Sequence, residues 1–121
     1  MKSKSELKKE YKNRKIPMGI YQIKNLNNGK VFIGSSANLD GIINRSRFAL
    51  NYGSHRNIEL QNDWKKLGEN KFTFEVLDYL EPKEGETIDY KEELVLLEQL
   101  WLEKIKPYGE RGYNKIPAKK I

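Results

Sequence analysis

Residues 18–36 read MGIYQIKNLNNGKVFIGSS, and this stretch decides the fold. Its two apolar runs, 18–25 and 30–36, carry the β-branched and aromatic residues that are typical of strands. Between them lies an Asn-Gly pair, Asn28-Gly29, which favours a tight hairpin because both positions of such a turn need a positive φ. The sequence therefore predicts two short antiparallel strands joined by Asn28-Gly29 as a two-residue loop.

The predicted hairpin brings two aromatic side chains together. In this register Tyr21 and Phe32 share a parity and project from the same face of the sheet. Gly34 belongs to that face and leaves a gap without a side chain. Two rings beside a gap are compatible with a substrate pocket, although aromatic pairs on a strand are more often part of the core.

Downstream of the hairpin the pattern predicts three helices and one more strand. Asn38 fits the N-cap of the first helix, while Gly53 and Gly68 fit the positions that end the first and second helices. The expected elements are a helix from Asn38 to about Asn51, a helix over Asn57–Leu67, a strand over 71–79 and a helix over Tyr90–Lys106. The order indicates an α+β unit, a small and mainly antiparallel sheet with helices packed on it.

The composition sets limits on the class of protein. A chain of 121 residues, 37% hydrophobic, is long enough for one folded domain with a modest core. The absence of cysteine excludes disulfides and thiolate metal sites. No apolar run approaches the length of a membrane span, and residues 1–16 are too charged for a secretory signal, so we expect a cytoplasmic protein.

The net charge of +6 is concentrated at the two ends of the chain. Residues 1–16 are predicted to form a basic arm and 115–121 a basic tail, and both flank a domain over 17–114 with a small negative charge. The two ends could bind nucleic-acid phosphates, or they could be solvated segments. Residues 81–89 are expected to form an acidic loop that lies away from any DNA-binding face.

The last predicted helix contains a carboxylate in an apolar stripe. At 100° per residue from Leu94, the side chains of Leu97, Trp101 and Ile105 fall within about 60°, and Glu98 falls about 40° away. An unpaired carboxylate is costly to bury, so Glu98 needs a metal, a cationic partner or hydrogen bonds. A structural salt bridge is the plainest of these alternatives.

The order of motifs resembles the GIY-YIG nuclease family. Gly19-Ile20-Tyr21, followed eleven residues on by Phe32-Ile33-Gly34, is similar to the paired motif that names the family. The resemblance covers about residues 18–114 and is closest to the phage homing-endonuclease branch. It continues through Ser35-Ser36, Asn38-Leu39, Gly53-Ser54-His55, Leu60-Gln61, Trp64, Leu67-Gly68, Phe72, Phe74, Glu98 with Trp101, and Gly112-Tyr113-Asn114.

The resemblance implies a fold and a chemistry. The fold would be a three-stranded antiparallel sheet flanked by three or more helices. The activity would be hydrolysis of DNA phosphodiester bonds with one divalent cation, Mg²⁺ or Mn²⁺, held by Glu98. Tyr21 would position or deprotonate the attacking water, and Asn114 would support the site by hydrogen bonding. A substrate-binding role is implied for Phe32, Gly34 and His55.

Two departures from the family pattern bear on catalysis. The tyrosine of the second motif is Phe32, which keeps the ring and loses the hydroxyl. The family's arginine on the first helix is replaced by Ile42, and losing such a donor typically costs on the order of a hundredfold or more in rate.

Arg45 lies one turn beyond Ile42 and about 60° around the helix, so its guanidinium could reach back into the site. Ser46 stands where the family has a helix histidine. The alternative is a catalytically degenerate domain that binds nucleic acid or a protein partner.

Overall fold

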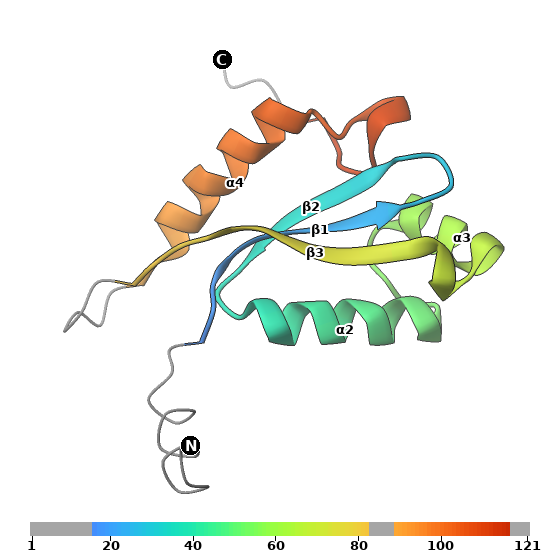
Figure 1. Cartoon of the computed structure of the whole chain (residues 1–121), viewed down its shortest axis with the longest axis horizontal. Helices are drawn as coiled ribbons and strands as arrows, with labels where there is room; N and C mark the ends of the chain where they lie inside the picture. Colours follow the sequence, from blue (N-terminus) through green and yellow to red (C-terminus); the bar gives the residue numbers. More distant parts are fainter. Residues whose placement is uncertain (1–15, 83–88, 117–121) are drawn as a thin grey trace, which may run out of the picture.

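The computed structural model describes residues 16–82 and 89–116 and contains a three-stranded antiparallel sheet in the order β2-β1-β3 (Figure 1). Its strands are β1 (Gly19–Asn25), β2 (Val31–Ser36) and β3 (Phe72–Tyr79), which confirms the predicted sheet. Residues outside the described part are 1–15 of the predicted arm, 83–88 of the acidic loop and 117–121 of the predicted tail. Within the described part, no helix is long and apolar enough to cross a membrane.

The loop of the hairpin is longer than predicted. Tyr21 pairs with Gly34 and Lys24 with Val31, so the loop comprises the four residues 26–29 and not Asn28-Gly29 alone. The main-chain carbonyl of Asn25 accepts from the Gly29 N–H at 2.8 Å, and the Asn25 N–H donates to Lys30 at 2.8 Å. The two-residue prediction was therefore wrong.

The reason for the longer loop lies in its backbone angles and in Asn25. Gly29 has a φ of +79°, but Asn28 does not adopt a positive φ, so the tight turn with two such positions does not form. Instead the buried Asn25 side chain accepts from the Asn27 N–H at 2.8 Å and starts the turn early. A shift of two residues keeps every side chain on its face, and Tyr21 and Phe32 still share one.

Three helix ends lie at the capping residues predicted for them, Asn38, Gly53 and Gly68. The Asn38 side chain accepts from the N–H of Gly41 at the start of α2 (Leu39–Tyr52), and Gly53 ends this helix with a φ of +89°. The Asn57 side chain caps α3 (Ile58–Leu67), and Gly68 follows it. The last helix, α4, covers Lys91–Ile105, and short 3-10 turns lie at Glu69–Lys71 and Gly109–Arg111.

The sheet is covered on both faces by different helices (Figure 1). One face packs on α2 and α3, and α4 packs on the other through Leu97, Trp101, Leu102 and Ile105, which confirms the predicted apolar stripe of this helix. Because β2 is an edge strand, side chains from the two faces can meet around its free edge. The buried residues of the first face are Tyr21, Ile23, Leu39, Leu50, Leu60, Trp64, Phe72 and Tyr113.

Candidate active site

Tyr21 lies across the backbone of the edge strand. It is buried on the α2 face of the sheet, directly opposite Gly34. A Cβ atom at Gly34 would lie 2.7 Å from the Tyr21 hydroxyl oxygen and 2.8 Å from two of its ring carbons. The predicted gap at Gly34 therefore exists, but the Tyr21 ring occupies it. Phe32 stands beside that ring, with 6.3 Å between the centroids.

The Tyr21 hydroxyl has polar neighbours from two helices. It is hydrogen-bonded to the buried Ser46 of α2, and both Glu98 and Arg45 lie within electrostatic range. Burial raises the pKa of Tyr21, Glu98 raises it further, and the Ser46 hydrogen bond and Arg45 oppose the rise. The net direction is upward, so in the protein alone the phenol keeps its proton at neutral pH. A general base for neutral pH needs the opposite direction.

Glu98 approaches the same edge from the other face of the sheet. It projects from α4, half-buried, and both the side chain and the main chain of Ser35 hydrogen bond to it. Among the residues that the structure describes, no lysine, arginine or histidine forms an ion pair with Glu98, so the salt-bridge alternative is not met there. Burial raises the pKa of Glu98, and the hydrogen bonds from Ser35 oppose that rise.

Asn114 is engaged with the main chain of β2. Its Oδ1 accepts from the Ile33 N–H at 2.9 Å, and its Nδ2 donates to the Ile33 carbonyl at 2.8 Å. The amide thus imitates a neighbouring strand and holds both main-chain groups of Ile33, the residue before Gly34. Alternate residues of β2 have main-chain groups that point away from β1, and these groups form hydrogen bonds with other segments. Val31 bonds to the main chain of Tyr113, Ile33 to Asn114 and Ser35 to Glu98.

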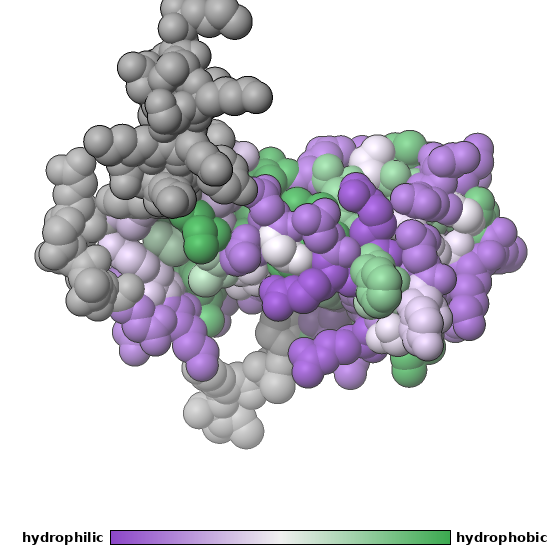
Figure 2. Space-filling model, turned by 90° about the horizontal axis from the view of Figure 1, so that it is seen from below, coloured by the Kyte–Doolittle hydropathy of each residue, from purple (hydrophilic) through white to green (hydrophobic). Residues whose placement is uncertain are grey.

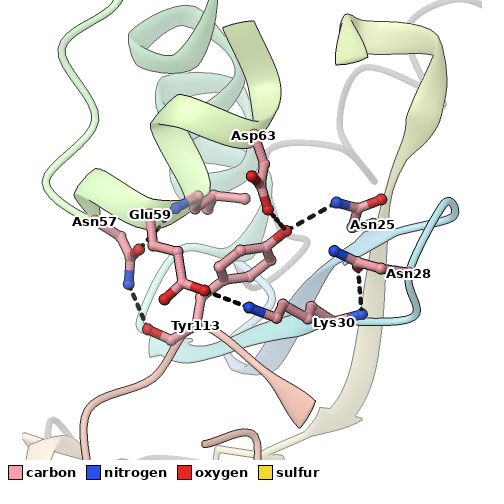
Figure 3. A network of polar contacts seen from close by, with 8 residues as sticks. Asn25, Asn28, Lys30, Asn57, Glu59, Asp63 and Tyr113 are labelled. Carbon is pink, nitrogen blue, oxygen red and sulfur yellow. Dashed lines mark hydrogen bonds and ion pairs between the residues drawn. The ribbon is translucent and has the colours of Figure 1, made fainter. Parts of the chain in front are cut away.

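A polar network fixes the segment that carries Asn114 (Figure 3). The Tyr113 hydroxyl donates to Asp63 at 2.7 Å and accepts from the Asn25 amide at 2.9 Å. The Asn57 side chain donates to the Tyr113 carbonyl at 2.7 Å, while Lys30 pairs with Glu59 close by. Tyr113 therefore connects the hairpin, α3 and the C-terminal segment at one point.

Replacing Tyr113 by phenylalanine is expected to destabilise the fold by about 1.5–3 kcal/mol. The change removes a hydrogen bond to a carboxylate and leaves the buried Asn25 amide without its acceptor, and unsatisfied groups of this kind cost in that range. Urea unfolding of Tyr113→Phe measures it. Tyr79→Phe, at an exposed tyrosine, is the control and should change stability by less than about 0.5 kcal/mol. Equal effects of the two changes would refute the role of the network.

His55 and Phe32 form the wall of the site next to α3. The His55 ring meets Phe32 edge-on, with centroids 5.7 Å apart and planes at 89°. Its Nδ1 accepts from the Asn57 N–H at 3.0 Å, which leaves Nε2 to carry the proton of the neutral ring. Burial lowers the pKa of His55, so the ring is neutral at pH 7. His55, for which the resemblance implies a substrate-binding role, is therefore half-buried beside Phe32.

The two arginines of α2 point in different directions. Arg45 is exposed and lies close enough to Tyr21 to lower its pKa, so its charge is on the side of the site. The Arg47 guanidinium lies over the Phe74 ring at 4.7 Å, toward β3. Ile42 packs against the apolar cluster between α2 and the sheet.

Two site residues were not selected from the sequence. The sequence marks Ser46 only as a departure from a family histidine, and Ser35 only as part of the matching motif series. A hydroxyl on the apolar face of α2 was the one available signal for Ser46. Ser35 gave none, because its partner Glu98 lies 63 residues away in the chain.

The oxygen donors at this edge fit a single hard cation. Over residues 16–82 and 89–116, no group of three or more His, Asp or Glu side chains gathers, and Glu98 supplies a single carboxylate at this edge. Mg²⁺ retains several waters and commonly binds through one or two carboxylates together with substrate phosphates. One carboxylate with neighbouring hydroxyl groups agrees with that mode of binding.

Comparison with known proteins identifies similar chains. Intron-associated endonuclease 1 of Enterobacteria phage T4 is 34% identical over 97 residues, which cover 79% of this chain and 36% of the phage protein. The chain thus spans about a third of the length of this relative. No family model matches the sequence.

Two solved structures have the same fold. The catalytic domain of homing endonuclease I-TevI superimposes with a TM-score of 0.68 and 29% identity, over 83% of this chain and 99% of that domain. A variant of that domain with a glutamate replaced by alanine gives a TM-score of 0.68 and 29% identity, over 86% and 98%.

Proposed function

We propose, from its similarity to these two endonucleases, that the chain is a GIY-YIG nuclease that hydrolyses DNA phosphodiester bonds with one divalent cation, Mg²⁺ or Mn²⁺. The observation that carries the proposal is the meeting of Tyr21 and Glu98 at the free edge of β2. These groups come from opposite faces of the sheet, and each is held by a serine, Ser46 and Ser35 respectively.

Glu98 is proposed to hold the cation. Ser35 orients its carboxylate, and Asn114 keeps the strand in place through Ile33. A bound cation supplies positive charge that offsets the charge developing on the phosphate oxygens. Asn114 therefore acts as a positioning residue, because both of its polar atoms are engaged with the main chain.

Tyr21 is proposed to orient the attacking water or the scissile phosphate. Ser46 fixes the direction of its hydroxyl, and Gly34 lets the ring reach the edge of the sheet. Because burial raises its pKa, Tyr21 is a hydrogen-bonding group at neutral pH. A proton-abstracting role would require a nearby cation to lower that pKa.

Arg45 is proposed to take the place of the missing family arginine. Arg45→Ala should reduce metal-dependent nicking of supercoiled plasmid on the order of a hundredfold, because a cation that stabilises the phosphate in the transition state is lost. Arg47→Ala is the matched control, since this second exposed arginine of α2 lies over Phe74. Equal losses in both variants would argue for a general charge effect and against a role for Arg45.

A plasmid assay tests the proposed function directly. The protein is incubated with supercoiled DNA, with and without Mg²⁺ or Mn²⁺, beside Glu98→Ala. Nicking that requires both the metal and Glu98 supports the enzyme. Absence of nicking under every metal condition, with the protein folded, refutes it.

The second candidate is a catalytically degenerate domain that binds nucleic acid or a protein. Two observations favour it: Ile42 packs among apolar side chains where the family has arginine, and Phe32 lacks a hydroxyl. Gel retardation of DNA without nicking, unchanged in Glu98→Ala, would support this candidate.

A further inference from the structure

The outer face of α2 carries two aromatic side chains that the fold does not bury. Phe48 and Tyr52 are 71% and 79% exposed, and they lie one helical turn apart. Their rings are nearly parallel, with planes at 6° and centroids 6.1 Å apart. Figure 2 views the molecule from the α2 side, where most side chains are hydrophilic and the hydrophobic ones are scattered among them.

We propose that Phe48 and Tyr52, here called the aromatic platform, bind unpaired bases of the DNA strand beside the cleavage site. The proposal rests on the proposed function, because it assumes that DNA reaches the edge of β2. Exposed aromatic rings flanked by cations are the usual means by which proteins hold unpaired nucleotides without reading their sequence.

Positive charge lies at both ends of the aromatic platform. Arg45 precedes Phe48 by three residues and Tyr52 by seven, so all three project from one side of the helix. At the other end, a Cβ atom on Gly53 would lie 3.5 Å from the Lys65 ammonium. The one acidic residue of α2, Asp40, is in its first turn. A phosphate backbone running from Arg45 to Lys65 would place its bases over the rings.

The aromatic platform also lies at a suitable distance from the candidate active site. Arg45 is within electrostatic range of Tyr21, and the aromatic platform begins one turn further along the helix. From Arg45 to Tyr52 the helix rises about 10 Å, which corresponds to roughly three stacked nucleotides of one strand. The rings would therefore contact bases within a few nucleotides of the scissile phosphate.

A second exposed apolar pair, on α4, lacks the positive charge that DNA binding requires. Leu96 and Leu100 of α4 are 60% and 63% exposed and are also one turn apart. Their helix carries four glutamates against two lysines, and leucine has no π face for a base. The α4 pair suits neither phosphates nor bases, whereas the aromatic platform suits both.

Stacking gives the aromatic platform a preference for unpaired DNA. Each base stacked on an aromatic side chain contributes about 1–3 kcal/mol, and the bases of an intact duplex are already stacked on each other. Two rings should therefore increase the affinity for a single strand and leave the affinity for a duplex nearly unchanged.

The experiment measures binding without cleavage. Fluorescence anisotropy in EDTA compares a labelled 20-nucleotide single strand with its duplex, for wild type, Phe48→Ala/Tyr52→Ala and the control Leu96→Ala/Leu100→Ala. We expect the aromatic double variant to bind the single strand at least about 30-fold more weakly than wild type, and the duplex within about twofold of wild type. The control should match wild type on both, and Phe48→Tyr/Tyr52→Phe should keep single-strand affinity.

Three results would overturn the inference: wild type that does not bind the single strand, an aromatic double variant that binds it as wild type does, or equal losses on both substrates. The plasmid assay separates this failure from that of the proposed function. Single-strand binding that depends on the aromatic platform, without nicking, leaves the inference standing and refutes hydrolysis. Nicking that depends on Glu98, together with unchanged single-strand binding by the aromatic double variant, supports hydrolysis and refutes the inference about the aromatic platform.

Discussion

Glu98→Gln is expected to reduce metal-dependent nicking on the order of a thousandfold and to make the folded protein more stable at neutral pH. The loss of activity follows from removing the carboxylate proposed to hold the cation, whose charge stabilises the transition state by several kcal/mol. The gain in stability follows from burial, which raises the pKa of Glu98 above its ordinary value of 4.5. The folded state thus favours the neutral form that glutamine imitates.

The raised pKa of Glu98 makes the stability of the folded protein depend on pH. Between the ordinary pKa and the raised pKa, the folded state binds more protons at Glu98 than the unfolded state does. The stability contributed by this group is therefore present at low pH and is lost as the pH rises through the folded pKa. The stability difference between Glu98→Gln and wild type should be small at pH 4 and larger at pH 8.

Thermal unfolding at the two pH values, with and without Mg²⁺, measures these effects. Mg²⁺ at a hundred times its dissociation constant should stabilise wild type by about 2.7 kcal/mol and leave Glu98→Gln unchanged. Glu103→Gln, on the exposed side of the same helix, is the control and should behave as wild type. Equal stabilisation of Glu98→Gln and wild type by Mg²⁺ would place the cation elsewhere.

Gly34→Ala is expected to abolish most activity because the added methyl group displaces the Tyr21 side chain. The new methyl group would lie 2.7 Å from the Tyr21 hydroxyl oxygen, so the ring must move away from the edge of β2. A displacement of about 1 Å at a reacting group can cost a hundredfold in rate, and overpacking a buried ring costs roughly 1–3 kcal/mol of stability.

A double-mutant cycle isolates this contact. In a Tyr21→Leu background the shorter side chain no longer crosses the strand, so Gly34→Ala should cost little stability there. The difference between the two backgrounds is the coupling energy, expected to be about 1–3 kcal/mol from urea unfolding. If Gly34→Ala is equally costly in both backgrounds, its effect comes from the backbone of β2, and the contact with Tyr21 is not its cause.

Local signals in the sequence were sufficient for the elements of the fold. Asn38, Gly53 and Gly68 mark helix ends through hydrogen bonds to nearby main-chain atoms, and sequence reasoning identifies such contacts well. The hairpin loop was predicted too short, because the buried Asn25 begins the turn earlier than the Asn-Gly pair indicates.

The site was predictable only in part, because its contacts join distant segments. Glu98 stood out as a carboxylate in an apolar stripe, but its contact with Ser35 depends on how α4 crosses β2. The pairing of Asn114 with Ile33 likewise requires the C-terminal segment to run along the edge strand. The aromatic platform gave no signal, since helical periodicity identifies the buried face of α2 and not the exposed one.

The occupied edge of β2 has a consequence for association between molecules. An edge strand with unpaired N–H and C=O groups is a template on which the strand of another chain can add, leading to aggregation. In β2 the Val31 carbonyl, both main-chain groups of Ile33 and the Ser35 N–H are already bonded within the chain. The residues that build the candidate active site therefore also close this edge against intermolecular strand pairing.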